Sequence, residues 1–493
     1  MGLIRKIGSS FFLSLAAVLH SRGSRVGMVA AAGGSSKDDA YESEVQQCID
    51  THGFGRYQWR LLGIAGIGWA TDGMEMFVMA LILPELASEW QLSAERLGTL
   101  GGAVFGGMGL GAWFWGSMSD KHGRLRSYAA TLLIALTFGL ASSLSQDFWG
   151  LLLTRVGFGF GVGGFLPVCT ALFVESVPCS TRAYTMAGVN NLFTVGACFE
   201  ALLGMLILPT LGWRWLLVFS VSPLLISLLA TGALQESPEW LLVSGRTESA
   251  QLALQKMMVI NRVPPGDIPA RLAPVPKQKH QGELSALFNE HTRLTCVICS
   301  MWFLVAFSYY GAVFVLPTWL NAHSDSEYLG VLLSAAAEFP GNLLAAYLCN
   351  RIGGKMTLML FFMLGAITAL CCGLVADGLV WTWLMAFACL LKFVMAGAFC
   401  TIIIYSSEAY PTDVRSLGLG FANVFTRVAG CLTPLVGQLL LEYTSGLATF
   451  GTYSVCSLLA FFCATLLPPE IDEMTKRRNS RSRQTEKDPL IRK

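Results

Sequence analysis

Two acidic residues, Asp72 and Glu75, stand three positions apart in a stretch that is otherwise apolar, GWATDGMEMFV at residues 68–78. The surrounding run, roughly residues 59–83, is apolar enough for the interior of a lipid bilayer. One ionised side chain at the middle of a bilayer costs about 2.5–3.5 kcal/mol. Residues three apart share one face of a helix. We therefore expect both carboxylates to face a polar interior, where they could bind a cation or carry a proton.

Other charged residues are also flanked by apolar sequence: Arg155, Glu200, Glu338, Lys392 and Arg427. Arg155 and Lys392 could neutralise the acids or hold a bound carboxylate. Alternatively, these charges form an ion-pair network that only locks helices together, and Arg427 fits this structural interpretation best. Aromatic residues near the charges could stack on a ring or a cation, or serve only as packing and interface anchors: Trp69, Trp302, Tyr309, Tyr310 and Phe339.

The composition is that of a membrane protein. Of 493 residues, 54% are hydrophobic and 13% are Asp, Glu, Lys or Arg, whereas a soluble domain has about 25% charged residues. The net charge of +2 gives no indication of nucleic-acid binding. Twelve runs are long and apolar enough to cross a bilayer. One long polar stretch, 237–292, follows the sixth run, so the chain divides into two sets of six helices.

The basic residues of the loops predict the orientation in the membrane. They gather after the even-numbered runs, for example at Lys121, Arg124 and Lys355, and in the tail, which reads KRRNSRSR at 476–483. The loops after odd-numbered runs are short and mostly acidic or neutral. Because positive charge marks the cytoplasmic side, both termini and the central loop are expected in the cytoplasm.

The two sets of six helices share motifs. ESVPCSTR at 175–182 corresponds to EAYPTDVR at 408–415, and GSMSDKHGRLR at 116–126 is echoed by NRIGGK at 350–355. Arg155 in the fourth run has a counterpart in Lys392 in the tenth. Internal duplication of this kind is typical of carriers whose halves rock about a site at the bilayer midplane.

These motifs resemble those of known transporters. GSMSDKHGRLR matches the loop motif of the major facilitator superfamily, and QESPEWLLVSGR at 235–246 resembles an element of its sugar and organic-ion branches. A more specific resemblance, to the synaptic vesicle 2-related proteins near the niacin and organic-ion transporters, lies in GFGRYQWRL at 53–61, the acid pair, GWRWLL at 212–217, FSYYG at 307–311, EFPG at 338–341 and EAYPTDVRSLGLG at 408–420. It extends from about residue 53 to 469. Asn350 and Glu239 depart from the pattern, which has Asp and Arg there.

The resemblance implies an all-α membrane protein, with twelve transmembrane helices in two pseudo-symmetric six-helix bundles. The first, fourth, seventh and tenth helices would line a central cavity. The candidates for binding substrate or protons are then Asp72, Glu75, Arg155, Glu200, Glu338, Lys392, Tyr309 and Tyr310. The resemblance also implies a cytoplasmic gate that holds the halves together in the outward-open state, with the residues Asp120, Gly123, Arg124, Glu175, Arg182, Glu408 and Arg415.

We expect the bundles at 57–236 and 293–469, with a cytoplasmic linker at 237–292. The segment 1–56 would be a cytoplasmic tail, whose first 37 residues are either a targeting segment or a disordered or interfacial tail. The segment 470–493 would be a basic cytoplasmic tail. Within it, Glu486, Leu490 and Ile491 have the acidic-dileucine form that endosomal adaptors bind.

The function expected is secondary active transport of a small organic ion, a carboxylate or an amine, driven by protons through alternating access. The membrane would be the plasma membrane or that of an endosome or vesicle. The alternative is a vesicle membrane protein with a trafficking or partner-binding role and no transport. We expect no enzyme, cofactor or metal site, because no nucleophile–base pair or metal-ligand set emerges, and the long loop has no ATP-binding motif.

Overall fold

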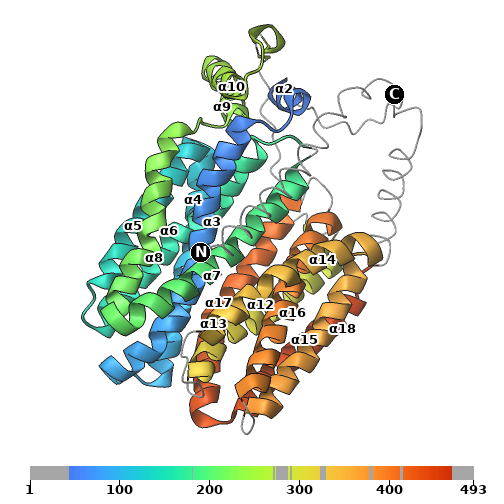
Figure 1. The fold of residues 1–493 in the computed structure, drawn as a ribbon. Coiled ribbons are helices and arrows are strands. Elements are labelled where there is room, and N and C mark those ends of the chain that lie inside the picture. The colour runs from blue at the N-terminus through green and yellow to red at the C-terminus, as the bar shows by residue number, and fades with distance from the viewer. Residues whose placement is uncertain are drawn as a thin grey trace.

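The computed structural model describes residues 44–179, 181–269, 272–273, 287–288, 291–321, 329–376, 381–410 and 415–468. Within these residues the regular structure is helical, and twelve helices are long and apolar enough to cross a membrane. They form two bundles that lie side by side (Figure 1). The predicted all-α architecture of twelve spanning helices is thus confirmed.

The N-terminal bundle consists of six spanning helices. These are α3 (Arg56–Trp90), α4 (Ala94–His122), α5 (Arg124–Ser143), α6 (Phe148–Val174), α7 (Arg182–Leu211) and α8 (Trp213–Ala230), the last extended by the short 3-10 helix η1 (Thr231–Ala233). Within the bundle α4 packs against α6, α5 against α6 and α8, and α3 against α7.

The C-terminal bundle repeats this plan with one interruption. Its helices are α12 (Thr292–Asn321), α13 (Leu329–Ala336), α14 (Glu338–Ile352), α15 (Gly354–Ala376), α16 (Trp381–Ala409), α17 (Arg415–Tyr443) and α18 (Gly446–Thr465). Helices α13 and α14 form the eighth span together and are separated at Ala337. Pro340 has no N–H to donate to the carbonyl of residue 336, which weakens the helix at this point. The interruption places Glu338 in the first turn of α14.

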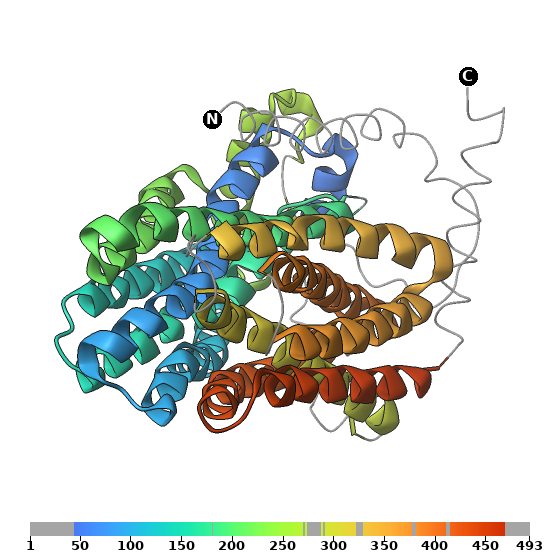
Figure 2. The same cartoon turned by 60° about the horizontal axis from the view of Figure 1, so that its bottom comes forward.

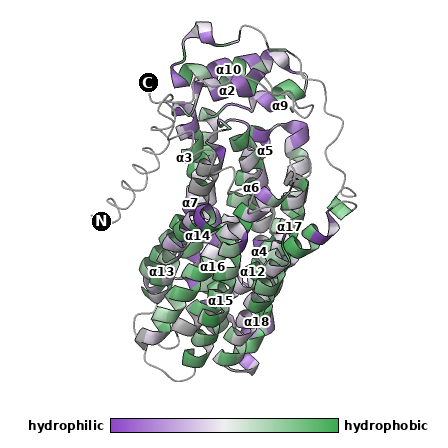
Figure 3. Cartoon of the chain, turned by 90° about the vertical axis from the view of Figure 1, so that its right-hand side faces the viewer, coloured by the Kyte–Doolittle hydropathy of each residue, from purple (hydrophilic) through white to green (hydrophobic). Residues whose placement is uncertain are grey.

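Short helices gather at one end of the molecule, which we call the linker face (Figure 1). They are α2 (Glu44–His52), α9 (Pro238–Val243), α10 (Thr247–Asn261) and the 3-10 helix η2 (Pro265–Asp267). Hydrophilic residues are frequent on α2, α9 and α10, whereas the spanning helices are mostly hydrophobic (Figure 3). Two hydrogen bonds anchor helix α2 to the N-terminal bundle. Asp50 Oδ1 accepts from the backbone N–H of Cys179, and Gln46 Nε2 donates to the carbonyl oxygen of Val177.

The two bundles meet along α4 and α17, α3 and α12, and α7 and α13 (Figure 2). Between α4 and α17 the separation grows toward the linker face. A Cβ atom added at Gly98 would lie 2.4 Å from Leu435 Cα, and one at Gly102 would lie 2.5 Å from the carbonyl oxygen of Cys431. At Gly109 the nearest atom is 4.0 Å away, and at Gly116 no atom lies within 4 Å. Helices α4 and α17 are therefore in close contact at the end opposite the linker face and diverge toward it.

Candidate functional site

The acid pair lies where α3 and α7 are in backbone contact. A Cβ atom at Gly73 would come within 2.0 Å of the carbonyl oxygen of Phe193, and one at Gly196 within 1.8 Å of that of Ala70. No larger residue fits at either position. This contact fixes the rotation of α3 at the turn that carries Asp72 and Glu75, both of which are buried.

Glu75 is paired inside the N-terminal bundle. Arg155 Nη1 on α6 lies 2.6 Å from Glu75 Oε1, and the two side chains are 0% and 2% exposed. Arg155 also lies over the ring of Phe158, at 5.6 Å from the ring centre. Its Nε and Nη2 atoms have no hydrogen-bond partner. Removing one partner of such a buried pair costs about 3–5 kcal/mol, because it leaves an uncompensated charge.

Glu200 on α7 belongs to the same cluster. It is fully buried and close enough to Glu75 and Arg155 for their charges to act on it. Its Oε1 atom lies 2.6 Å from Ser220 Oγ on α8, and its Oε2 atom has no hydrogen-bond partner. The cluster Glu75–Arg155–Glu200 thus contains two carboxyl groups and one guanidinium.

A second buried ion pair lies in the C-terminal bundle. Lys392 Nζ on α16 is 2.5 Å from Glu338 Oε1 on α14, and both side chains are 1% exposed. The hydroxyl of Tyr309 on α12 donates to Glu338 Oε2 at 3.0 Å. The ammonium of Lys392 lies 4.7 Å from the ring centre of Tyr309 and 4.9 Å from that of Phe77 on α3. The pair therefore touches the opposite bundle through Phe77.

Asp72 differs from its neighbour on the same turn, because it has no ion pair. Its side chain is buried, and Oδ1 has no hydrogen-bond partner. The described cation whose charge acts on it is Arg427 of α17, in the other bundle, yet no nitrogen–oxygen contact within 4.0 Å joins the two. Arg427 Nη1 contacts only the thioether sulfur of Met108 at 3.1 Å, and Nε has no partner.

Aromatic rings fill the space between these charges. Tyr309 and Tyr310 on α12 contact each other and Phe399 on α16, and Tyr310 meets Phe105 of α4 with ring centres 4.7 Å apart. Trp302 lies about two helical turns before Tyr309 on α12, and its indole nitrogen donates to Ser406 Oγ at 2.9 Å. The predicted aromatic neighbours Tyr309 and Tyr310 thus lie beside the charged residues, whereas Trp302 is occupied by a hydrogen bond within its own bundle.

The predicted gate residues lie at the linker face. Arg124 forms ion pairs with Asp120 and, at 3.1 Å, with Glu175 Oε1. Gly123 has φ +110°, a conformation that favours glycine, and Gly353 repeats it in the other bundle with φ +95°. Asp120, Arg124 and Glu175 all belong to the N-terminal bundle, so these ion pairs join helices within one half.

Sequence reasoning missed two residues of this cluster, Glu236 and Gln46. Glu236 Oε1 accepts from the backbone N–H groups of Arg124 and Leu125, at 2.9 and 3.0 Å, and so caps the start of α5. Gln46 Oε1 on α2 accepts from Arg182 Nη2 at 2.8 Å. Glu236 belongs to the motif QESPEWLLVSGR at 235–246, which the sequence analysis singled out.

Glu239 on α9 lies next to this cluster and outside the spanning helices. Burial raises its pKa, the carboxylate of Glu175 raises it further, and Arg182 and Arg124 act against this rise. Glu408 lies near the end of α16. The side chain of Arg415, the adaptor motif at 486–491 and the first 37 residues lie outside the described residues.

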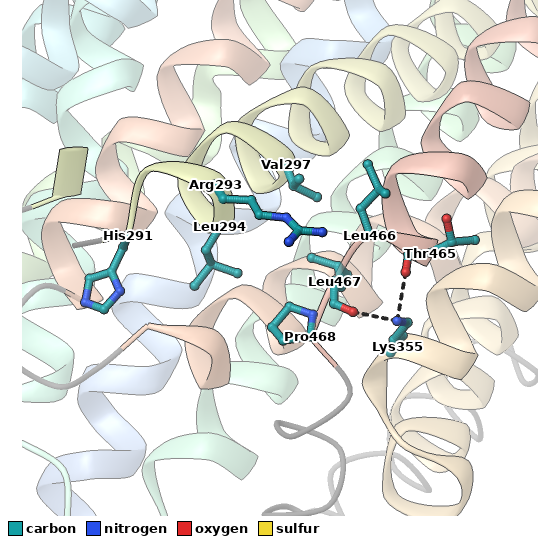
Figure 4. A pocket seen from close by; sticks show the side chains of 9 residues that line it. All are labelled: His291, Arg293, Leu294, Val297, Lys355, Thr465, Leu466, Leu467 and Pro468. Carbon is teal, nitrogen blue, oxygen red and sulfur yellow. Dashed lines mark hydrogen bonds between the residues drawn. The ribbon is translucent and has the colours of Figure 1, made fainter. Parts of the chain in front are cut away.

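A separate hollow of about 640 Å³ opens between the ends of α12, α15 and α18 (Figure 4). Its lining includes His291, Arg293 and Lys355, and Lys355 Nζ donates to the carbonyl oxygens of Thr465 and Leu467 at 3.0 and 2.5 Å. None of the buried charged residues lines this hollow. We therefore place the candidate site at the buried charges between the bundles.

Comparisons with known proteins identify the family and agree with the fold. The family model described as "Sugar (and other) transporter" matches residues 37–477. The synaptic vesicle 2-related protein of Rattus norvegicus is 31% identical over 450 residues, covering 86% of this chain and 81% of that protein. The organic cation/carnitine transporter 7 of Arabidopsis thaliana is 31% identical over 479 residues, covering 86% and 94%. The partially occluded inward open conformation of the xylose transporter XylE from E. coli has a TM-score of 0.68 at 17% identity, covering 82% and 96%.

Proposed function

Since the chain belongs to the sugar (and other) transporter family within the major facilitator superfamily, we propose that it is a secondary active transporter of a small organic ion, driven by protons. It is a multi-pass membrane protein of a transporter family. The observation that carries the finer proposal is the buried cluster Glu75–Arg155–Glu200, which has one carboxyl group more than it has cations.

Glu200 is the proton carrier in this proposal. Ser220 Oγ lies 2.6 Å from Glu200 Oε1 and 2.7 Å from the carbonyl oxygen of Leu216. A hydroxyl group has a single proton and cannot donate it fully to both acceptors. Both contacts are satisfied when Glu200 is protonated and donates to Ser220. The cluster is then electrically neutral, as a buried site surrounded by apolar residues requires.

The two bundles, 57–236 and 293–469, are the bodies that move in alternating access. The divergence of α4 and α17 supports a state that is open toward the linker face and closed at the opposite end. By the positive-inside rule the linker face is cytoplasmic, so this state is inward-open. The linker 237–292 and the tails 1–56 and 470–493 then also lie in the cytoplasm.

The gate would act by exchanging partners between the two states. In the inward-open state Asp120, Arg124 and Glu175 pair with one another, and Arg182 binds Gln46. In the outward-open state these residues would meet Glu408 and Arg415 of the other bundle. Exposed pairs contribute about 0–1 kcal/mol each, which is enough when two states differ by only a few kcal/mol.

The substrate is a small carboxylate or amine in this proposal, and the Arabidopsis thaliana relative is named as a transporter of organic cations and carnitine. The name of the Rattus norvegicus relative refers to synaptic vesicles, which supports the vesicle membrane among the locations considered. It also supports the second candidate function, a vesicle membrane protein that binds a trafficking adaptor through Glu486, Leu490 and Ile491. The retained intramembrane charges favour transport, because a scaffold has no use for them.

The test is uptake into proteoliposomes with an imposed pH gradient, scanning labelled organic cations and anions of similar size. Wild type should accumulate at least one compound, and accumulation should stop when the gradient is collapsed. The variant Asp72→Asn should lose this uptake while remaining folded, and Glu75→Gln, which leaves Arg155 without its carboxylate, should lose it together with part of its stability. If wild type accumulates no compound, or if both variants behave like wild type for every compound, the proposed transport role of these acids is wrong.

A further inference from the structure

Two charged residues of the spanning helices, the buried Asp72 and the half-buried Arg427, are left over once the others have been paired. Glu75 binds Arg155, Glu338 binds Lys392, and Glu200 contacts Ser220. Among the described residues deep in the spans, Asp72 and Arg427 are the acid and the base without such a partner. Asp72 Oδ1 and Arg427 Nε have no hydrogen-bond partner at all. Buried polar atoms are rarely left without a hydrogen bond, so an acid and a base that both have such atoms suggest that a ligand binds there.

The two residues stand on opposite bundles. Asp72 is on α3 of the N-terminal bundle, and Arg427 is on α17 of the C-terminal bundle. Arg427 reaches across the interface to Met108 of α4, at 3.1 Å. Their charges act on each other, and both act on Tyr310 of α12, yet no ion pair closes the gap between them. A molecule that bridges them would touch both bundles, as a substrate of an alternating-access carrier must.

We propose that Asp72 and Arg427 bind the oppositely charged ends of a small zwitterion, with its body against the rings of Tyr309 and Tyr310. This proposal rests on the transport function proposed above and names its substrate class. A carboxylate on the substrate would accept from the guanidinium of Arg427, which is suited to planar, bidentate contacts. A cationic group would lie beside the carboxylate of Asp72.

The charge balance of the site favours a ligand without net charge. The four acids Asp72, Glu75, Glu200 and Glu338 face the three bases Arg155, Lys392 and Arg427. When Glu200 carries a proton, the remaining acids and bases cancel. A simple amine or a simple carboxylate would then leave one charge uncompensated in a buried site, which is costly. A zwitterion leaves none.

Arg155 and Lys392, which the sequence also suggested as carboxylate ligands, are less suited to this role. Each already has a carboxylate at 2.6 or 2.5 Å. A substrate carboxylate would have to displace that partner and leave Glu75 or Glu338 unpaired. Arg427 gives up only a thioether contact, which is a weak interaction.

Three ring compounds of matched size test the proposal: N-methylpyridinium-3-carboxylate as the zwitterion, N-methylpyridinium-3-carboxamide as the cation and benzoate as the anion. Binding to the purified full-length protein is measured by thermal stabilisation and by competition. The zwitterion should bind at least about tenfold more tightly than either singly charged compound. Asp72→Asn should weaken the zwitterion and the cation but not the anion. Arg427→Gln should weaken the zwitterion and the anion but not the cation.

Two matched variants serve as controls, since each removes the same kind of charge outside the site. Asp147→Asn changes an exposed helix cap, and Arg351→Gln changes an exposed arginine that lies over Tyr347. Both should leave the binding of all three compounds unchanged. The zwitterion assignment is overturned if the cation binds as tightly as the zwitterion and Arg427→Gln has no effect, or if none of the three compounds binds. Proton-driven uptake of a simple cation would contradict this assignment while leaving the proposed transport function intact.

Discussion

The ammonium nitrogen of Lys392, on α16, lies 4.9 Å from the centre of the Phe77 ring on α3. This cation–π contact joins the two bundles at a buried point, and the same ammonium is paired with Glu338 in its own bundle. Because the contact crosses the interface, rocking of the bundles would change it. In the proposed alternating access, its strength would therefore contribute to the balance between the two states.

Phe77→Leu should shift this balance away from the state described here. A buried cation–π contact contributes about 0.5–2 kcal/mol, and a loss of 1.4 kcal/mol changes a population ratio tenfold. The measurement is the distance distribution between spin labels at Lys121 and Arg351, which lie at the linker-face ends of α4 and α14. Phe77→Tyr, which keeps the ring, should leave the distribution unchanged. Equal distributions for Phe77→Leu and wild type would show that the contact has no such role.

Gly98→Val should prevent closure of the end opposite the linker face. The added side chain would collide with the backbone of Leu435, since its Cβ alone would come within 2.4 Å of Leu435 Cα. We expect loss of transport with retained folding. Residues that are shielded in the wild type should also react with labelling reagents added from the side opposite the linker face. Gly116→Val is the matched control on the same helix, because no atom lies within 4 Å of the added Cβ. Similar activity of the two variants would contradict the described closure.

Arg155→Met should destabilise the protein strongly. The substitution leaves the carboxylate of Glu75 buried without a partner, which costs about 3–5 kcal/mol. The double variant Glu75→Leu/Arg155→Met should unfold at a higher temperature than Arg155→Met alone, because it removes both charges. The exposed pair Glu89–Arg214, at 3.0 Å with both side chains 41% exposed, is the control. Arg214→Met should change stability by about 1 kcal/mol or less. A double variant that is less stable than Arg155→Met would refute this interpretation.

Glu239→Gln should raise the melting temperature at neutral pH. The pKa of Glu239 is raised in the folded protein, first by burial and then by Glu175. The folded state therefore holds this proton more tightly than the unfolded state, whose pKa is about 4.3. The stabilisation is fully present below that unfolded value and is lost as pH rises through the raised folded pKa. The variant should lack this part of the decline above the unfolded pKa, whereas Glu248→Gln, at an exposed position of α10, should retain it.

The fold could be predicted from the sequence because its signal is local. Hydropathy and length identify each spanning helix without reference to its neighbours. The interruption at Ala337 was not predicted, since the run from Leu329 to Ile352 is apolar enough on average to be identified as one spanning helix. The loop motif and its echo at 350–355 correctly suggested related turns, and Gly123 and Gly353 do adopt similar conformations.

The partners of the buried charges could not be predicted, because they depend on helix rotation and on contacts between distant helices. Asp72 and Glu75 were expected to act as a pair. In the structure Glu75 instead forms an ion pair with Arg155 of α6, whereas Asp72 has no ion pair and is influenced by the charge of Arg427 on α17. Arg427 was judged the most structural of the cations, yet it is the one whose guanidinium has only a sulfur contact. Glu200 was predicted as a candidate for binding substrate or protons, but its hydroxyl partner, Ser220, could not be predicted because it is on another helix.

The most direct test of proton-coupled transport compares accumulation with exchange in proteoliposomes, for wild type and Glu200→Gln. Wild type should accumulate substrate against its gradient when the pH gradient is imposed, and should also exchange labelled for unlabelled substrate without one. Glu200→Gln keeps the contact with Ser220 but cannot release a proton, so it should exchange substrate and fail to accumulate it. Accumulation by Glu200→Gln at the wild-type level would contradict the assignment of Glu200 as the proton carrier.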